Sequence, residues 1–118
     1  MEGEGGQHVL PNVEQAWIAR SKTEGYLLRF RATDDKAGYF LRFGFAAEAP
    51  EVLETALREH ARRHPVVRTM ETPFGRKYVV AGRLETPDGR HPDILATWQI
   101  DHGATAPRLV TAYRNRRS

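Results

Sequence analysis

The sequence predicts an α+β protein in which two or three N-terminal helices pack on one face of a four-stranded antiparallel meander. Apolar residues recur at helical spacing before Pro65, whereas apolar and polar residues alternate after it. The turn signals "PFG", "TPDG" and "DHGATAP" separate the alternating runs. Because the helical segments precede the extended ones instead of alternating with them, an antiparallel sheet is expected.

The length and composition predict one small domain. A chain of 118 residues can bury one core but has little room for a second. We assign residues 1–7 to a flexible tail, 8–113 to the domain and 114–118 to a basic tail. No apolar run approaches the roughly 20 residues of a membrane span, and the glycine-rich start does not read as a signal peptide. A cytoplasmic location is therefore expected.

The first elements are short. The segment "EQAWI", residues 14–18, predicts a short edge strand. Ser21 and Glu24 have the spacing of a capping box, in which a hydroxyl and a carboxylate satisfy the first N–H groups of a helix. A short helix is therefore expected over residues 21–28.

Two further helices follow. A second helix is expected over residues 34–44, capped by Thr33 or Asp34 and ended by Gly44, with Phe40 and Phe43 turned toward the core. A third begins at Pro50, which suits a first helical position, and ends before Pro65. Its expected apolar stripe consists of Val52, Leu53, Ala56, Leu57, His60 and Ala61.

Four extended runs predict the strands of the sheet: residues 66–72, 76–85, 93–100 and 108–113. In the third run Trp98 shares a face with Ile94 and Ala96, so it is expected in the core. In the fourth run, strict alternation places Leu109, Thr111 and Tyr113 on one face and Arg108, Val110, Ala112 and Arg114 on the other. The small apolar members of the second set are expected to pack under the helices.

Charge is distributed unevenly along the chain. Residues 1–57 carry six basic and nine acidic side chains, whereas residues 58–118 carry twelve basic and six acidic ones. The basic half favours an anionic partner, most often a nucleic acid. The alternative is a solvated arginine-rich surface, since the chain has fifteen arginines and three lysines.

Residues that could bind a metal or act as nucleophiles are few. The chain has no cysteine, which excludes disulfides, thiolate catalysis and cysteine zinc sites. His60 and His64 lie four residues apart on one helix, but a third ligand is missing. We expect no metal and no cofactor, and we expect His60 to be a partly buried structural histidine or a member of the site described next.

The predicted sheet contains a more promising group of candidate catalytic residues than the two histidines. Lys77 lies in the second strand, and Thr111 and Tyr113 lie in the fourth. Hydroxyls, a tyrosine and cations can hold a phosphate, stabilise developing negative charge and move a proton, which is what a metal-free ribonuclease needs. Lys36 is a further candidate, because a cation in the first turn of a helix opposes the helix dipole. The same residues are also compatible with RNA binding alone, or with a plain polar face.

The order of short motifs resembles a known family. The segments "LPN", "YLL", "KAGYF", "FGF", "EHARRHPV", "TPFGRKYVV", "TPDGR" and "PRLVTAY" occur in that order over residues 10–113. This pattern resembles an uncharacterised family of small bacterial domains of unknown function, whose members are often encoded beside a second small protein. The helix-then-sheet layout is similar to the barnase, colicin D and RelE group of ribonuclease toxins.

The resemblance implies candidate site residues. The matching motifs point to Lys36, Lys77, Tyr78, Trp98, Arg108, Thr111 and Tyr113. Two segments depart from the pattern: the stretch before "KAGYF" is shorter than usual, and "RNRRS" replaces a usual proline. With His60 added from the residue analysis, the predicted catalytic set is Lys36, His60, Lys77, Thr111 and Tyr113. The predicted nucleic-acid-binding set is Arg76, Arg108, Arg114, Arg116 and Arg117.

These inferences define two functional hypotheses. In the first, the protein is a toxin-like, metal-independent ribonuclease or RNA-binding domain that a protein from a neighbouring gene restrains. In the second, it is a non-enzymatic adaptor whose polar sheet face docks another protein. The basic tail is expected to assist binding electrostatically in the first case and to be passive in the second.

Overall fold

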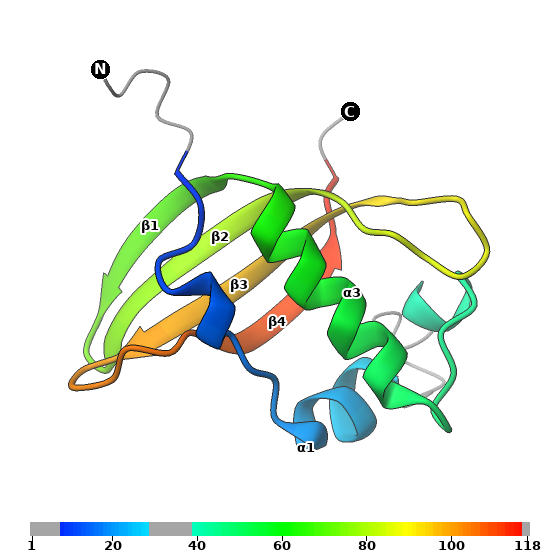
Figure 1. Cartoon of the computed structure of the whole chain (residues 1–118), viewed down its shortest axis with the longest axis horizontal. Coiled ribbons are helices and arrows are strands. Elements are labelled where there is room, and N and C mark those ends of the chain that lie inside the picture. The colour runs from blue at the N-terminus through cyan, green and yellow to red at the C-terminus, as the bar shows by residue number, and fades with distance from the viewer. Residues whose placement is uncertain (1–7, 29–38, 117–118) are drawn as a thin grey trace.

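A four-stranded antiparallel sheet dominates the computed structural model, which describes residues 8–28 and 39–116. Its strands run in the order β1-β2-β3-β4, so each strand pairs with the next one along the chain (Figure 1). The predicted antiparallel meander is therefore confirmed. The strands are β1 (Val66–Thr72), β2 (Gly75–Arg83), β3 (Asp93–Asp101) and β4 (Arg108–Arg114).

The turn between β1 and β2 depends on a glycine and a threonine. The Thr72 hydroxyl oxygen accepts hydrogen bonds from the N–H groups of Phe74 and Gly75, each at 3.1 Å. A Cβ atom added at Gly75 would lie 2.2 Å from the carbonyl oxygen of Ile100 on β3. Only glycine therefore allows β2 to begin this close to β3, and the predicted "PFG" turn is confirmed.

The predicted "TPDG" turn lies inside a longer loop over residues 84–92. Asp88 Oδ1 accepts a hydrogen bond from the Thr86 hydroxyl at 2.8 Å and from the Arg90 N–H at 3.0 Å. The Arg90 N–H is the main cause that lowers the pKa of Asp88 to about 2. Strand β2 ends at Arg83, two residues earlier than predicted, and Thr86 bonds instead to the side chains of Asp88 and His91.

The longest helix, α3 (Pro50–Arg63), confirms the predicted third helix. Pro50 lies at its start, where the missing N–H costs nothing, and basic side chains lie in its last turn. The predicted apolar stripe is partly wrong, because the side chain of Val52 is 42% exposed. The buried residues of α3 are Pro50, Leu53, Glu54, Leu57, His60 and Ala61.

Glu54 is buried because it links α3 to the preceding helical segment. Its carboxylate accepts a hydrogen bond from the Thr23 hydroxyl at 2.7 Å and from the Arg20 guanidinium at 2.9 and 3.2 Å. Only 6% of Glu54 is exposed, and Thr23 is fully buried. The arrangement satisfies the hydrogen-bonding capacity of a buried carboxylate.

We expect the substitution Glu54→Ala to lower the free energy of unfolding by about 2 kcal/mol, because it leaves the buried Thr23 hydroxyl without its acceptor. Glu51→Ala is the matched control, since Glu51 lies one turn earlier on α3 and is exposed. Urea unfolding followed by circular dichroism measures both variants. Equal effects of the two substitutions would contradict a structural role for the Glu54 contacts.

The short N-terminal elements differ from the predictions. The segment Val13–Gln15 forms a 3-10 turn instead of a strand, and Trp17 alone forms a parallel bridge to Arg108 on β4. Helix α1 (Arg20–Lys22) continues as a π-helical turn over Thr23–Leu27, which confirms the helix expected over residues 21–28. The capping box is wrong: the N-cap residue is Ala19, which makes no side-chain hydrogen bond.

Only the end of the predicted second helix can be assessed. Residues 33–38, which include Lys36, lie outside the described residues. Tyr39 to Leu41 are helical, and Gly44 follows with φ of 99°, as expected for a residue that ends a helix. Phe40 is fully buried, and Phe43 packs against the core.

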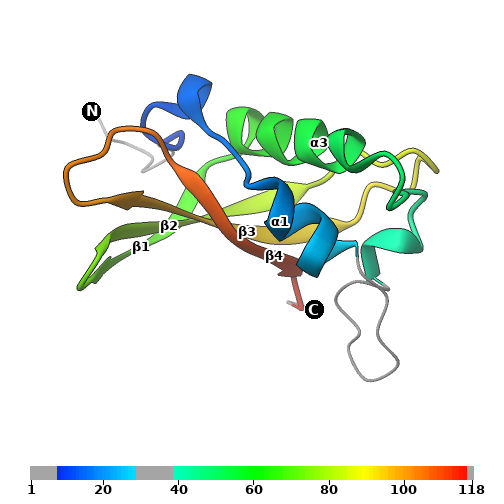
Figure 2. The ribbon, with the colours of Figure 1, turned by 90° about the horizontal axis from the view of Figure 1, so that it is seen from below.

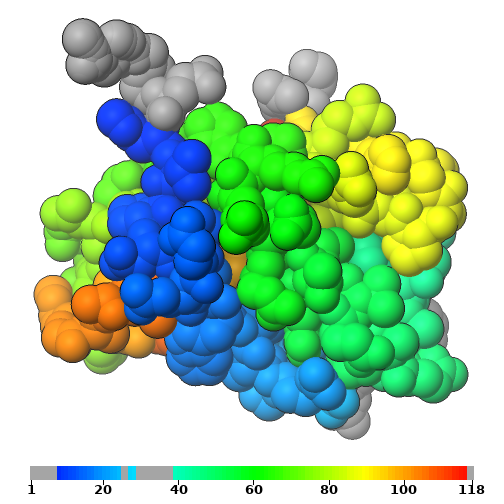
Figure 3. All heavy atoms as spheres, viewed as in Figure 1, coloured from blue at the N-terminus to red at the C-terminus, as the bar shows by residue number. Residues whose placement is uncertain are grey.

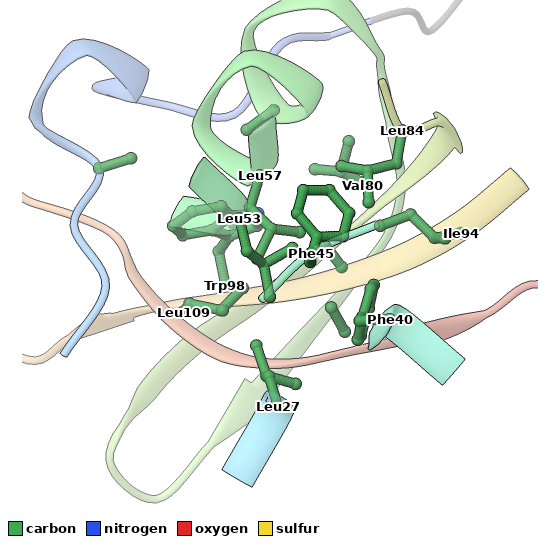
Figure 4. Packing of buried hydrophobic residues seen from close by; sticks show 14 of the residues in the cluster. Leu27, Phe40, Phe45, Leu53, Leu57, Val80, Leu84, Ile94, Trp98 and Leu109 are labelled. Atoms are coloured by element: carbon green, nitrogen blue, oxygen red, sulfur yellow. The ribbon is translucent and has the colours of Figure 1, made fainter. Parts of the chain in front are cut away.

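The core lies between α3 and one face of the sheet. Figure 2 shows α3 on one side of the four strands, and Figure 4 shows Leu53 and Leu57 close to Trp98. Trp98 is fully buried, as predicted. On this side the N-terminal segment, α3 and the loop after β2 form a continuous surface (Figure 3). Within residues 8–28 and 39–116, no helix has the length and apolar composition needed to span a membrane.

Candidate nucleic-acid-binding face

The sheet face opposite α3, here called the open face, contains a hollow of about 350 Å³. No described helix covers β1, β2 or β3 on this side (Figure 2). All four strands contribute residues to the hollow, so its shape depends on the sheet and not on a loop. Its lining residues are Val67, Arg68, Met70, Lys77, Val79, Leu95, Thr97, Val110, Thr111 and Tyr113.

A β-bulge in β4 determines which of its side chains reach the open face. Trp98 pairs with Leu109, but Thr97 pairs with Thr111, so Val110 is an extra residue in β4. The bulge turns Leu109 into the core, where it is 3% exposed, and brings Val110 to the hollow. The predicted alternation of β4 is therefore wrong at Leu109 and Val110, although Thr111 and Tyr113 face outward as expected.

The hollow is positively charged. Among its described lining residues, Arg68 on β1 and Lys77 on β2 are basic, and none is acidic. Within the described part of the chain, neither cation forms a hydrogen bond or an ion pair. Both charges are therefore available to an anionic ligand, and their long side chains allow them to move toward it.

The opposite side of the hollow carries hydroxyl groups. Thr97 and Thr111 are direct partners on β3 and β4, and Tyr113 lies two residues beyond Thr111. The Thr111 Oγ1 atom is buried and has no hydrogen-bond partner in the described structure. An unpaired buried hydroxyl typically costs about 1–3 kcal/mol, and a ligand oxygen in the hollow would remove that cost. Strands β2 and β4 lie about 10 Å apart at the usual strand spacing, so Lys77 faces the hydroxyls across the floor of the hollow.

His60 lies on the other side of the sheet. It belongs to the buried face of α3, and its Nε2 atom lies 3.0 Å from the carbonyl oxygen of Gly82. Burial is the main cause that lowers its pKa to about 4, so the ring is neutral near pH 7. The expectation that His60 joins Lys77, Thr111 and Tyr113 is wrong in geometry, because the sheet separates it from them.

Two of the predicted binding arginines are held by carboxylates. Arg76 pairs with Glu71, and it points away from the open face because neighbouring residues of a strand face opposite sides. Arg108 makes two hydrogen bonds to Asp101, at 2.8 and 3.1 Å. Asp101 raises the pKa of Arg108, and Arg108 in turn lowers the pKa of Asp101. These arginines contribute less free positive charge than Arg68 and Lys77.

The remaining predicted residues lie near the end of β4 or outside the described residues. Arg114 is the last residue of β4, so the strand extends one residue beyond the predicted boundary at Tyr113. The Asn115 N–H donates a hydrogen bond to the Asp93 carbonyl at 3.0 Å, which ties the first tail residues to the start of β3. Lys36 and Arg117 lie outside the described residues.

Sequence reasoning missed Arg68 and Thr97 as candidate site residues. The register of β1 shifts between Val66 and Arg68, which brings Arg68 opposite Val79 on the open face. Thr97 lies between Ala96 and Trp98, and the alternation of side chains along a strand was the signal that could have shown its sheet face. Strict alternation from Trp98 would have placed Thr97 on the open face, but no sequence signal indicated the bulge in β1.

The fold and the hollow define a class of α+β domain with one helix-covered sheet face and one basic open face. A chain in the solved structure of a contact-dependent growth inhibition toxin–immunity protein complex from Klebsiella pneumoniae 342 has the same fold, with a TM-score of 0.63. The match covers 87% of this chain and 97% of that one at 15% sequence identity. No curated protein matches the sequence.

The chain belongs to the DUF6883 family, described as a domain of unknown function, whose model matches residues 9–116. The match spans nearly the whole chain and includes every strand of the sheet. The resemblance to a family of unknown function, inferred from the order of motifs, is therefore confirmed.

Proposed function

We propose that the protein is a toxin-like domain that binds RNA on its open face and cleaves it without a metal ion. One observation carries the proposal: within the part of the chain that the structure describes, two unpaired cations and a set of hydroxyls line the same hollow, and no described lining residue is a carboxylate. Such a surface attracts a phosphate group, and the described residues include no acidic cluster that could hold a divalent cation. The shared fold with a chain of a toxin–immunity protein complex supports the toxin-like class.

The proposed reaction uses the ribose as its nucleophile. The 2′-oxygen of one nucleotide attacks the adjacent phosphorus, its proton passes to solvent, and the bond from phosphorus to the 5′-oxygen breaks. Tyr113 donates a proton to the leaving 5′-oxygen and regains one from water. Arg68 and Lys77 stabilise the additional negative charge on the phosphorus oxygens. The products are a 2′,3′-cyclic phosphate and a 5′-hydroxyl.

Incubation of the purified chain with RNA in excess chelator tests this proposal. We expect cleavage that leaves 2′,3′-cyclic phosphate ends, because the mechanism requires the 2′-hydroxyl and no metal. An oligonucleotide with a single 2′-deoxy nucleotide at the mapped cleavage position is the control, and we expect it to stay intact there. Cleavage of the deoxy oligonucleotide, or cleavage only after magnesium is added, would contradict the mechanism.

A protein partner is the second candidate ligand, and the exposed apolar residues near the sheet edge favour it. Strand β1 is an edge strand, and Val67, Met70 and Phe74 on β1 and its turn are 56%, 37% and 71% exposed. An apolar edge strand beside a basic hollow suits a partner that adds a strand to β1 and covers the hollow. Such a partner would restrain the proposed toxin, or would be the sole ligand if the domain is an adaptor.

Co-expression with the protein from a neighbouring gene tests this second candidate. We expect Val67→Ser combined with Phe74→Ser to weaken a co-purified complex by at least roughly tenfold, given that buried aromatic anchors often dominate binding energy. Val52→Ser is the control, because Val52 is a similarly exposed apolar residue on α3. An unchanged complex with the double variant would place the partner on another surface.

A further inference from the structure

A second hollow, of about 290 Å³, lies at the end of β4. Its described lining combines aromatic rings with three arginines that come from separate segments. Arg42 follows the helical turn at Tyr39 to Leu41, whereas Arg114 and Arg116 come from the end of β4 and the basic tail. The full described lining is Tyr39, Phe40, Arg42, Ala112, Tyr113, Arg114 and Arg116.

The three arginines of this hollow are not neutralised. Within residues 8–28 and 39–116, the side chains of Arg42, Arg114 and Arg116 form no ion pair, and no carboxylate lines the hollow. Asp93 is an acidic group close enough to act on Tyr39 electrostatically, and its carboxylate lies 3.4 Å from the amide of Asn115. The excess positive charge therefore remains available to an external anion.

The aromatic part of the hollow is held in place by ring packing. Tyr39 packs edge-to-face against Phe40 and Phe43, with ring centroids 5.3 and 5.1 Å apart. Burial raises the pKa of the Tyr39 hydroxyl, so it remains protonated at neutral pH. Tyr39 is 9% exposed and Phe40 is fully buried, so a planar group that enters the hollow would meet the exposed edge of Tyr39 and the guanidinium groups of the arginines, and guanidinium planes stack on nucleobases.

Tyr113 lines this hollow and also the hollow on the open face. The two hollows are therefore neighbours on either side of one side chain. In the proposed reaction Tyr113 acts at the phosphate that is cleaved, so the next nucleotide of the strand would lie beside it.

We propose that the second hollow is a nucleotide subsite, in which Tyr39 and the three arginines hold the base and flanking phosphate next to the bond that is cleaved. The inference rests on the proposed function, and it assigns a substrate class: single-stranded RNA with an unstacked base adjacent to the scissile phosphate. It also gives the basic tail a role, because Arg116 belongs to the subsite.

The test uses a 2′-O-methyl RNA oligonucleotide, which has no free 2′-hydroxyl and cannot be cleaved. Its affinity is measured by fluorescence anisotropy at several salt concentrations for the full chain. The site variant combines Arg42→Gln, Arg114→Gln and Arg116→Gln. The matched control combines Arg58→Gln, Arg62→Gln and Arg63→Gln on α3, and removes the same charge from the other side of the sheet.

We expect the site variant to bind at least tenfold more weakly, and its slope of log affinity against log salt to fall by about 0.7, since the subsite holds one phosphate and each phosphate contact in a single strand contributes about 0.7. The control variant should lose less than about threefold, as expected for long-range charge alone. Equal losses in the two variants would overturn the inference, because they would show a general effect of charge.

A second measurement separates base recognition from phosphate binding. Oligonucleotides with one abasic position are compared on the wild-type chain and on Tyr39→Leu, and circular dichroism verifies that the variant is folded. We expect one abasic position to weaken wild-type binding by about tenfold, in line with the usual contribution of one stacked base, and Tyr39→Leu to be insensitive to it. Equal sensitivity at all positions would overturn the subsite. Because the oligonucleotide is not cleaved, these results do not depend on whether Lys77 and Tyr113 catalyse cleavage.

Discussion

Replacing Lys77 with alanine is expected to lower the rate of RNA cleavage by roughly 100-fold to 1,000-fold, the usual cost of removing one group that stabilises a charged transition state. Tyr113→Phe should lower the rate by a similar or larger factor, about 100-fold to 10,000-fold, because it removes the proton donor for the leaving oxygen. Both losses should occur in the rate constant under saturating RNA. Single-turnover cleavage of a labelled oligonucleotide in chelator measures them.

Two further variants test whether the loss of cleavage rate is specific to the open face. Arg62→Ala removes a cation from the exposed side of α3, where it pairs with Glu59, and should leave the rate within about twofold. Thr111→Val preserves the shape of the hollow and removes the unpaired hydroxyl, so a defect in binding would show that the hydroxyl contacts the substrate. If Lys77→Ala and Tyr113→Phe both cleave RNA at the wild-type rate, the open face is not the active site.

Acidification from pH 7 to pH 4 is expected to lower the free energy of unfolding by about 3 kcal/mol through His60 alone. The pKa of His60 falls from 6.5 to about 4 in the folded chain, mainly because the ring is buried. Between these two values the unfolded chain binds a proton that the folded chain does not, so stability decreases as the pH decreases. The difference between these two pKa values corresponds to about 3 kcal/mol at 1.36 kcal/mol per pKa unit, and most of it is lost by pH 4.

The His60 effect can be separated from that of the carboxylates. Asp88 and Asp101 have lowered pKa values, so their contributions are lost as the pH falls below the ordinary carboxylate range. Urea unfolding of His60→Gln at several pH values should show a flatter profile between pH 7 and pH 4 than the wild type. A His60 ring that titrates near pH 6.5 by NMR would contradict the assigned burial effect.

The secondary structure was largely predictable because its signals are local. A proline at the start of α3 and basic residues at its end indicate a helix, because a helix forms its hydrogen bonds between residues that are close in the chain. Turn residues such as those of "PFG" indicate a turn, because they favour particular backbone angles within a few residues. The same local reasoning failed at Ser21. Its spacing with Glu24 matches a capping box, but the chain enters the helix at Ala19 because Glu54 holds the side chains of Arg20 and Thr23.

The candidate site was predictable in part for the same reason. Lys77, Thr111 and Tyr113 were chosen by residue type and alternation, and they do line one hollow. Arg68 could not be chosen because it reaches the open face through a bulge in β1, which depends on pairing with β2. His60 was chosen by its chemistry, and nothing in its sequence context shows on which side of the sheet its helix packs.

The sequence by itself determined the order of helices and strands, the turns between them and the excess of basic residues in the second half. Each of these depends on residues that are close in the chain or on composition alone. The tertiary structure decided the register of β4, which turns Leu109 inward and Val110 outward. It also decided which cations are paired, since Arg108 binds Asp101 while Lys77 binds no carboxylate among residues 8–28 and 39–116. These outcomes depend on contacts between strands and loops that are far apart in the chain. The free energies of such contacts cannot be inferred from a local sequence pattern.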